Sequence, residues 1–279
     1  MQFLIGSQKT RKIYNINFIS VIFYIYCACV FIFLVLPLFV VLPISISSAK
    51  YLEFPPRGIS LRWYENFFTS KEWVRATFNS LKVATMTSFL ASLIGIPAAL
   101  ILARHRFKGR EFIYSFLLSP MIIPVIILAI AVYFYFASFK LVGNIYVLSL
   151  AHTILALPVV LVTVSASLQG FDQTLEYAAM SLGANRLKTF FKVTFPLIRP
   201  GVITGAVFAF ITSFDEIVIA IFLSGSRAIT LPRRMWSSIR EEIDPTIAAV
   251  SSLLIISSIL LLLLITALRR RSERLKGMD

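Results

Sequence analysis

Two adjacent acidic residues lie within an apolar stretch of the C-terminal half of the chain. Asp215 and Glu216 occur in the sequence ITSFDEIVIAIF. A carboxylate at the middle of a membrane costs at least about 2.5 kcal/mol on insertion scales, so its presence suggests a function. Phe210 and Phe214 precede the pair, and aromatic rings bind cations through their faces. These four residues predict a negatively charged site on a path for a cationic solute.

A structural role for the acidic pair is the alternative. The carboxylates could pair with an arginine of an outer loop or of a partner protein, or they could face water near the end of a span. The residues alone leave the functional and the structural interpretation open.

The sequence contains no recognisable catalytic motif. The phosphate-binding pattern G-x-x-x-x-G-K-[ST], the dinucleotide fingerprint and H-E-x-x-H are all absent. His105 and His152 have no Cys or acidic residues at metal-ligand spacing, and Cys27 and Cys29 lie two residues apart within an apolar segment. We therefore expect no catalytic residue, no metal and no cofactor. Energy for uphill transport must come from elsewhere.

The composition is that of a membrane protein. Of the 279 residues, 58% are hydrophobic and only 14% are charged. The mean hydropathy is +0.85. So few charges cannot cover so much apolar surface in water. Backbone groups in lipid must be satisfied internally, and the strict alternation of a β-barrel is absent, so we predict an all-α integral membrane protein.

Six apolar segments are long enough to cross a bilayer, which takes about 20 residues. They lie at about 17–46, 77–103, 112–136, 145–167, 198–223 and 247–268. We predict one membrane domain over 17–268, with an N-terminal tail at 1–16 and a basic tail at 269–279. The first segment is longer than the apolar core of a signal peptide and has basic residues before it, which indicates an uncleaved first span.

The distribution of Lys and Arg predicts the orientation. An N-terminus in the cytoplasm places the loop 104–110, the segment 168–199 and the basic C-terminal tail on the same side, where cations exceed acids. Both termini are then cytoplasmic. The net charge of +14 is explained by this topology and by an anionic inner leaflet, so it does not indicate a nucleic-acid partner.

The cytoplasmic segment 168–197 has two amphipathic patterns. In the first, Leu175, Ala178, Ala179 and Leu182 lie at i, i+3, i+4 and i+7, which predicts a short helix with a small-residue face. Gly183 is expected to end this helix in the left-handed conformation. An alanine face without bulky side chains allows another backbone to approach closely.

A second short helix is predicted to follow. Leu187, Phe190, Phe191 and Thr194 have the same spacing, and Pro196 is expected to end the helix before Pro200 and Gly201 begin the fifth span. An exposed apolar face surrounded by cations is typical of a docking site. A basic helix lying on the membrane surface fits the spacing equally well.

The same segment resembles the permease subunits of bacterial ABC importers. Their pattern is E-A-A, three residues, Gly, nine residues, I-x-L-P; here Ala178-Ala179-x3-Gly183-x9-Val193-x-Phe195-Pro196 matches it in order and spacing. Tyr177 stands at the position of the family's Glu, and Glu176 lies one place earlier, so no specific ion pair of that Glu is carried over.

The resemblance implies the type I importer permease fold in a bacterial inner membrane, with six transmembrane helices and both termini cytoplasmic. It implies that the loop 174–196 docks on a separate ATPase. The expected partners are an ATPase homodimer, a second permease subunit, an extracytoplasmic solute-binding protein and the lipid bilayer. The residues that the motif assigns to ATPase coupling are Glu176, Tyr177, Ala178, Ala179, Gly183, Val193 and Pro196.

A second resemblance concerns the solute. SFDE followed by LPRRMWSSIREEIDP is similar to the second permease of spermidine/putrescine importers. It implies a polyamine-type cation as the solute. An opine, iron or another organic cation is an alternative, because relatives for those solutes share parts of the pattern. An ion-driven secondary transporter or a channel acting alone is a further alternative.

Overall fold

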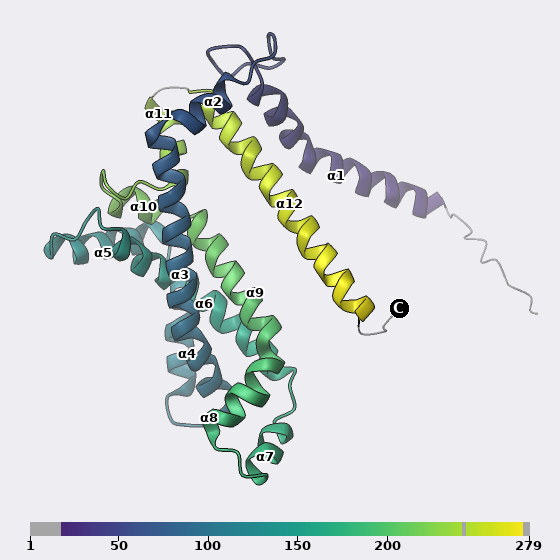
Figure 1. Ribbon diagram of the computed structural model, residues 1–279, viewed down its shortest axis with the longest axis vertical. Helices are drawn as coiled ribbons and strands as arrows, with labels where there is room; N and C mark the ends of the chain where they lie inside the picture. Colours follow the sequence, from purple (N-terminus) through teal and green to yellow (C-terminus); the bar gives the residue numbers. More distant parts are fainter. Residues whose placement is uncertain (1–17, 242–243, 276–279) are drawn as a thin grey trace, which may run out of the picture. The chain divides into compact units, whose positions relative to one another are not determined.

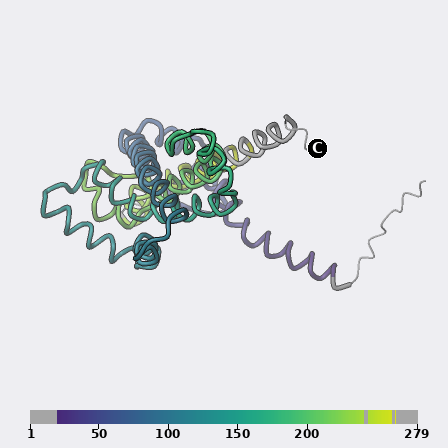
Figure 2. Tube along the Cα trace, turned by 90° about the horizontal axis from the view of Figure 1, so that it is seen from below, coloured from purple at the N-terminus to yellow at the C-terminus, as the bar shows by residue number. Residues whose placement is uncertain are grey.

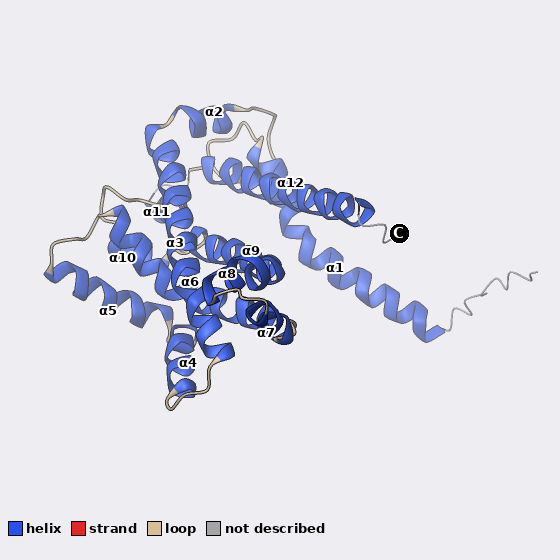
Figure 3. Cartoon of the chain, turned by 60° about the horizontal axis from the view of Figure 1, so that its bottom comes forward, coloured by secondary structure: helices blue, strands red, loops and turns tan. Residues whose placement is uncertain are grey.

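The computed structural model describes residues 18–241 and 244–275. The chain forms two compact units, one made of Met1–Tyr64 with Pro245–Asp279 and the other of Glu65–Asp244. The described elements are helices joined by loops (Figure 3). The predicted tail 1–16 lies outside the described residues.

The first unit contains the two terminal helices. α1 (Phe18–Ser45) packs along α12 (Thr246–Leu275), and most apolar side chains of α1 are exposed within this chain. Tyr64 at the start of α2 (Arg62–Thr69) links them, because its hydroxyl lies 2.7 Å from Ser45 Oγ and 2.7 Å from Ser252 Oγ. α12 continues beyond the predicted limit of 268, so residues 269–275 of the predicted tail are helical.

The core of the second unit is a group of three long helices. α3 (Lys71–Arg104), α6 (Ile145–Gln169) and α9 (Phe195–Phe214) pack side by side (Figure 1). Glycine permits their close approach: a Cβ added to Gly95 would lie 2.9 Å from Val160 Cγ1, and one added to Gly205 would lie 3.4 Å from Val160 Cα. Small residues at contacts are the usual way in which helices pack in lipid.

The third predicted segment, 112–136, is not one straight helix. α4 (Arg110–Leu118) and the 3₁₀ turn η1 (Ser119–Met121) end there, and α5 (Val125–Ser138) starts in a new direction, with a bend of 98°. Pro120 and Pro124 lie at the break. Proline has no N–H to donate and restricts the residue before it, so two prolines four residues apart interrupt the helix.

The fifth predicted segment, 198–223, is not one unbroken helix either. α9 ends at Phe214, and Asp215–Ile217 separate it from α10 (Val218–Leu223). α10 packs against α5 and α6, and α11 (Leu231–Glu241) packs against α3. The helix that contains the second predicted segment is longer than that segment, since α3 starts at Lys71 rather than at 77.

Within the described residues, four helices are long and apolar enough to cross a membrane, and the bent pair α4–α5 could supply a fifth span. The apolar part of α12, Thr246–Leu260, corresponds to the sixth predicted segment. Each of the six predicted segments therefore contains apolar helix, and two of the six are broken.

Candidate functional site: a cytoplasmic loop and an acidic break

The predicted first loop helix is α7 (Thr174–Ser181). Asp172 lies just before the helix, and its carboxylate accepts hydrogen bonds from Thr174 N at 2.9 Å and from Thr174 Oγ1 at 2.6 Å. The hydrogen bond from the Thr174 hydroxyl, followed by that from its backbone N–H, lowers the pKa of Asp172. A fully ionised acid at this end also suits the helix dipole.

Gly183 ends α7 as the sequence predicted. Its φ is +88°, in the left-handed region that residues other than glycine rarely adopt. Ala184 N donates a hydrogen bond to Ala179 O at 3.1 Å. No atom of the chain lies within 4 Å of a Cβ built on Gly183, so that face of the turn is open.

The second loop helix runs without interruption into the membrane, which corrects the prediction that Pro196 ends it. α8 (Arg186–Thr189) starts at Asn185, whose side chain accepts from Lys188 N at 2.8 Å. It continues through the π-helical segment η2 (Phe190–Thr194) into α9, a helix of 29 residues from Arg186 to Phe214. Pro196 falls at the second position of α9, where hydrogen bonding changes from π to α, so its missing N–H and helical φ are tolerated.

Glu176 ties the loop to the end of α3 and to the π segment. Arg104 Nη2 donates to Glu176 Oε1 at 3.3 Å, and Thr194 Oγ1 donates to the same oxygen at 2.8 Å. Arg104 Nε lies 3.3 Å from Oε2, at ion-pair distance without hydrogen-bond geometry. The guanidinium also lies 5.0 Å from the ring centre of Phe171. We call Arg104, Glu176 and Thr194 the loop clamp.

The loop clamp is half-buried: the side chains of Arg104 and Glu176 are 15% and 13% exposed. A cavity of about 430 Å³ lies beside it between α3, α7 and η2. The resemblance to the permease motif did not predict the ion pair between Glu176 and Arg104. The signal that could have found it is that Arg104 is the last residue of its span and Glu176 is the single acid of the opposite helix.

The outer face of the loop is apolar and exposed. Tyr177, Leu182, Leu187 and Phe191 have exposed fractions of 56%, 89%, 71% and 63%. We call these four residues the loop surface; Arg186, Lys188 and Lys192 are exposed beside it. The loop surface lies on α7, the turn that follows it, α8 and η2, at one end of the second unit, the end from which Figure 2 is viewed.

The other predicted coupling residues lie in the same segment with different exposure. Ala178 and Pro196 are exposed, and Ala179 and Val193 are half-buried. The structure thus brings Tyr177, Ala178 and Gly183 to the exposed side of the loop, and it places the carboxylate of Glu176 on the inner side.

The acidic pair lies at the break between α9 and α10, not inside a continuous span. Asp215 is exposed, and within the described residues its carboxylate accepts no hydrogen bond and forms no ion pair. Glu216 has a structural contact, since its Oε1 accepts from Ile219 N at 2.8 Å in the first turn of α10. The rings of Phe210 and Phe214 stack on each other 5.9 Å apart, at an interplanar angle of 17°.

The two histidines occupy different environments. His152 is fully buried in α6, and its Nδ1 lies 2.9 Å from Ser213 Oγ on α9. His105 is exposed in the loop after α3. No group of three His, Cys, Asp or Glu residues that could hold a metal ion occurs in the part of the chain that the structure describes.

Comparison with known proteins identifies the family. The family described as binding-protein-dependent transport system inner membrane component matches residues 95–276. The chain is 30% identical over 227 residues to the spermidine/putrescine transport system permease protein PotC of Haemophilus influenzae, covering 80% of this chain and 87% of PotC. It is 33% identical over 230 residues to the putrescine transport system permease protein PotI of Escherichia coli K12, covering 80% and 82%.

Two further similarities are to transporters of other solutes. The sulfoquinovosyl glycerol transport system permease protein SmoH of Agrobacterium fabrum is 31% identical over 186 residues, 66% of this chain and 65% of SmoH. The crystal structure of a bacterial ABC transporter involved in the import of the acidic polysaccharide alginate contains a chain with the same fold. Its TM-score is 0.74 at 15% identity, over 96% of this chain and 99% of that one.

The apolar helices, the exposed cytoplasmic loop and the family match over residues 95–276 agree. The chain therefore belongs to the binding-protein-dependent transport system inner membrane components, the multi-pass permease subunits of ABC importers.

Proposed function

We propose that this chain forms half of the translocation pathway of an importer for a small cationic solute of the polyamine type. A membrane permease of this family does not hydrolyse ATP, so a separate ATPase supplies the energy. The names of the relatives PotC and PotI support a polyamine, and so does the resemblance around SFDE.

The observation that carries the solute proposal is the environment of Asp215. Its carboxylate is exposed at a helix break, and no cation of the described chain neutralises it. Phe210 and Phe214 lie on the last turns of α9 before it. A polyamine ammonium can pair with such a carboxylate and pass over aromatic faces at the same time. Glu216 contributes negative charge nearby while it holds the start of α10.

The loop 174–196 is proposed to dock on the ATPase. Its loop surface is apolar, surrounded by cations and uncovered by the chain itself, which is the pattern of a protein contact. The residues proposed for this contact are Tyr177, Ala178, Ala179, Gly183, Val193 and Pro196, with Glu176 acting from inside the loop. Closure of two ATPase subunits would then shift the permease between inward-facing and outward-facing states.

An importer permease of this family works with an ATPase, a second permease and a solute-binding protein. We propose here an ATPase homodimer, a second permease of different sequence and a binding protein on the outer side. The relatives' names include a solute that is not a polyamine, sulfoquinovosyl glycerol, so an importer for another solute is the second candidate. The resemblance around SFDE suggests an opine, iron or another organic cation for that solute.

The test is purification and uptake. The tagged chain should co-purify with an ATPase and a second permease, and polyamine uptake into proteoliposomes should require ATP inside and the binding protein outside. Uptake by the lone chain driven by an ion gradient would refute the importer proposal. ATP-dependent uptake of another solute, without uptake of polyamines, would refute the polyamine assignment but not the proposed coupling to an ATPase.

A further inference from the structure

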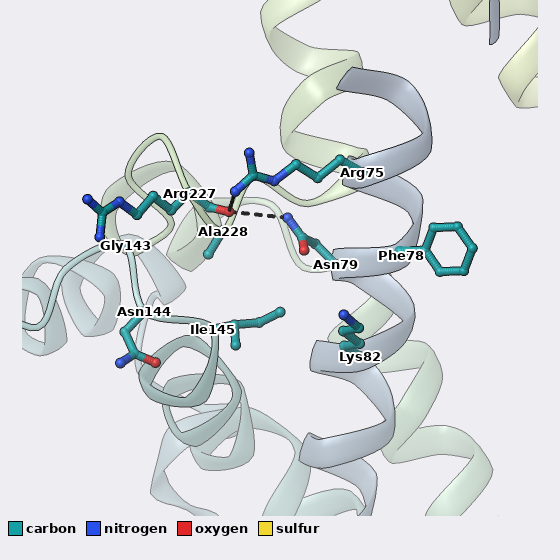
Figure 4. Close-up of a pocket in the computed structure, with 9 residues that line it drawn as sticks. All are labelled: Arg75, Phe78, Asn79, Lys82, Gly143, Asn144, Ile145, Arg227 and Ala228. Carbon is teal, nitrogen blue, oxygen red and sulfur yellow. Dashed lines mark hydrogen bonds between the residues drawn. The ribbon is translucent and has the colours of Figure 1, made fainter. Parts of the chain in front are cut away.

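A basic cavity lies at the end of α3 opposite the loop clamp. It has a volume of about 600 Å³, and its charged lining residues are Arg75, Lys82 and Arg227. Figure 4 shows Arg75, Asn79 and Lys82 on α3 facing the start of α6 across this space, with the Arg227 backbone above it. Among the residues that the structure describes, no acidic side chain lines the cavity.

The cavity is shaped by hydrogen bonds to the backbone. Arg75 Nη2 donates to Arg227 O at 3.2 Å, and Asn79 Nδ2 donates to Ile229 O at 2.9 Å, so α3 holds the segment before α11 in place. Within the described residues, none of Arg75, Lys82 and Arg227 forms an ion pair. Arg75 and Lys82 therefore face a space whose described lining residues supply no counter-charge, and Arg227 adds positive charge at its rim.

The depth of the cavity matches a lipid headgroup. Lys82 lies about 33 Å along α3 from Arg104, at 1.5 Å per residue. The hydrocarbon core of a bilayer is roughly 30 Å thick. If Arg104 lies at the cytoplasmic boundary beside the loop, Lys82 lies at the outer headgroup level, and Arg75 and Asn79 lie just beyond it.

An apolar groove continues from the cavity toward the membrane centre. It shares Lys82 and Ile145 with the cavity and is lined further along by Leu81, Met86 and Tyr146. Beyond it, exposed apolar side chains continue down both helices: Phe89 and Leu93 on α3 and Leu150 on α6. Charge at headgroup depth above an apolar groove at acyl-chain depth matches the polarity of a phospholipid.

We propose that this cavity and groove bind one anionic phospholipid of the outer leaflet. Lys82 and Arg75 hold the phosphate, and an acyl chain lies along Leu81 and Tyr146. Arg227 adds positive charge at the rim, where its side chain extends past Gly143 (Figure 4). The backbone N–H groups at the start of α6 add positive potential at the same level. Cations at the headgroup level, with no acid among the described lining residues, select a lipid with net negative charge over one with an ammonium headgroup.

The acidic surface of a solute-binding protein is the other anionic occupant of an outer cavity. It would use the cations, but a protein docking from the water would not fill an apolar groove that extends toward the hydrocarbon core. The lipid accounts for both parts of the surface. This inference does not depend on the identity of the solute or on the ATPase contact.

The test is native mass spectrometry of the purified protein with the subunits that co-purify, titrated with phosphatidylglycerol or phosphatidylethanolamine. Each cation near an anionic lipid contributes about 1 kcal/mol, about fivefold in affinity. The double variant Arg75→Gln, Lys82→Gln should therefore bind the first phosphatidylglycerol about 30-fold more weakly. Binding of phosphatidylethanolamine should not change, and inorganic phosphate at the same concentration should not compete.

The matched control is Lys50→Gln, Lys71→Gln, which removes two exposed cations of the predicted outer side that do not line the cavity. Its affinity should stay within about twofold of the wild type. Because Arg75 also holds the backbone, Lys82→Gln alone serves if the double variant misfolds, with about a fivefold loss expected. An equal loss in variant and control, or unchanged lipid affinity with weaker binding-protein affinity, would overturn the proposal.

Discussion

The loop clamp makes a measurable prediction about how firmly the cytoplasmic loop is held. Glu176→Ala removes an ion pair to Arg104 and the acceptor of the Thr194 hydroxyl. Hydrogen bonds to charged groups contribute about 1.5–3 kcal/mol, and exposed ion pairs less than about 1 kcal/mol. Because the two charged side chains retain 13–15% exposure, we expect a loss of about 2 kcal/mol in the free energy of local opening.

Hydrogen exchange measured by mass spectrometry reports this opening directly. A loss of about 2 kcal/mol raises the opening equilibrium about 30-fold, so amides of 174–189 should exchange about 30-fold faster in Glu176→Ala. Glu176→Gln keeps an acceptor for Thr194 and should lose only about 1 kcal/mol, or about fivefold. ATP-driven uptake should fall in the same order, with membrane insertion unchanged.

Arg106→Ala is the control for charge, since Arg106 is an exposed cation two residues beyond the clamp with no ion pair among the described residues. It should leave exchange in 174–189 unchanged. The double variant Arg104→Ala, Glu176→Ala should lose less than the sum of the two single losses, because the residues are in contact. Additive losses, or wild-type exchange in Glu176→Ala, would refute the clamp.

Three further changes test the loop, the acidic break and the helix core. Gly183→Leu should reduce ATP-dependent uptake, because it strains a positive φ by about 1–2 kcal/mol and adds bulk to an open face. Asparagine tolerates that φ better than leucine. Equal uptake by Gly183→Asn and Gly183→Leu would therefore exclude backbone strain as the cause. Asp215→Asn should lower polyamine uptake at unchanged expression. Glu216→Gln should lower both uptake and the melting temperature, because it weakens the hydrogen bond to the start of α10. Normal uptake by both variants would show that the acidic pair has only a structural role. Gly201→Ala should lower the melting temperature by several degrees, because the new Cβ would lie 2.6 Å from Ser167 Cβ. Gly170→Ala is the control and should not lower it, because its nearest atom would lie 3.8 Å away. Similar melting curves for the two variants would contradict this packing.

The fold class and the loop could be predicted because they depend on local pattern. Apolar length alone located the six segments, and the i, i+3, i+4 spacing with a following glycine located α7 and its left-handed end at Gly183. These signals reflect forces that act within a few residues, namely burial of one helix face and the conformational freedom of glycine.

The breaks in the helices were missed because hydropathy does not report hydrogen bonding. Residues 112–136 and 198–223 are apolar throughout apart from a few positions, yet prolines bend the first and Asp215–Ile217 interrupt the second. The opposite error occurred at Pro196, where a π segment carries the helix through a proline. In each case the deciding factor was where backbone donors found partners.

The loop clamp and the basic cavity were missed for another reason. Arg104 is 72 residues from Glu176, and Arg75 is 152 residues from Arg227. The distribution of charge predicted on which side of the membrane each of these four residues lies. It could not predict their contacts, because those depend on how α3 packs against its neighbours, which one sequence does not reveal.

The uninterrupted helix from Arg186 to Phe214 has a mechanical consequence. It is about 43 Å long at 1.5 Å per residue. One end carries Leu187 and Phe191, and the other ends directly before Asp215. A tilt of this helix at the loop end would therefore also move the Asp215 carboxylate, and the π segment and Pro200 are the points at which the helix could bend instead.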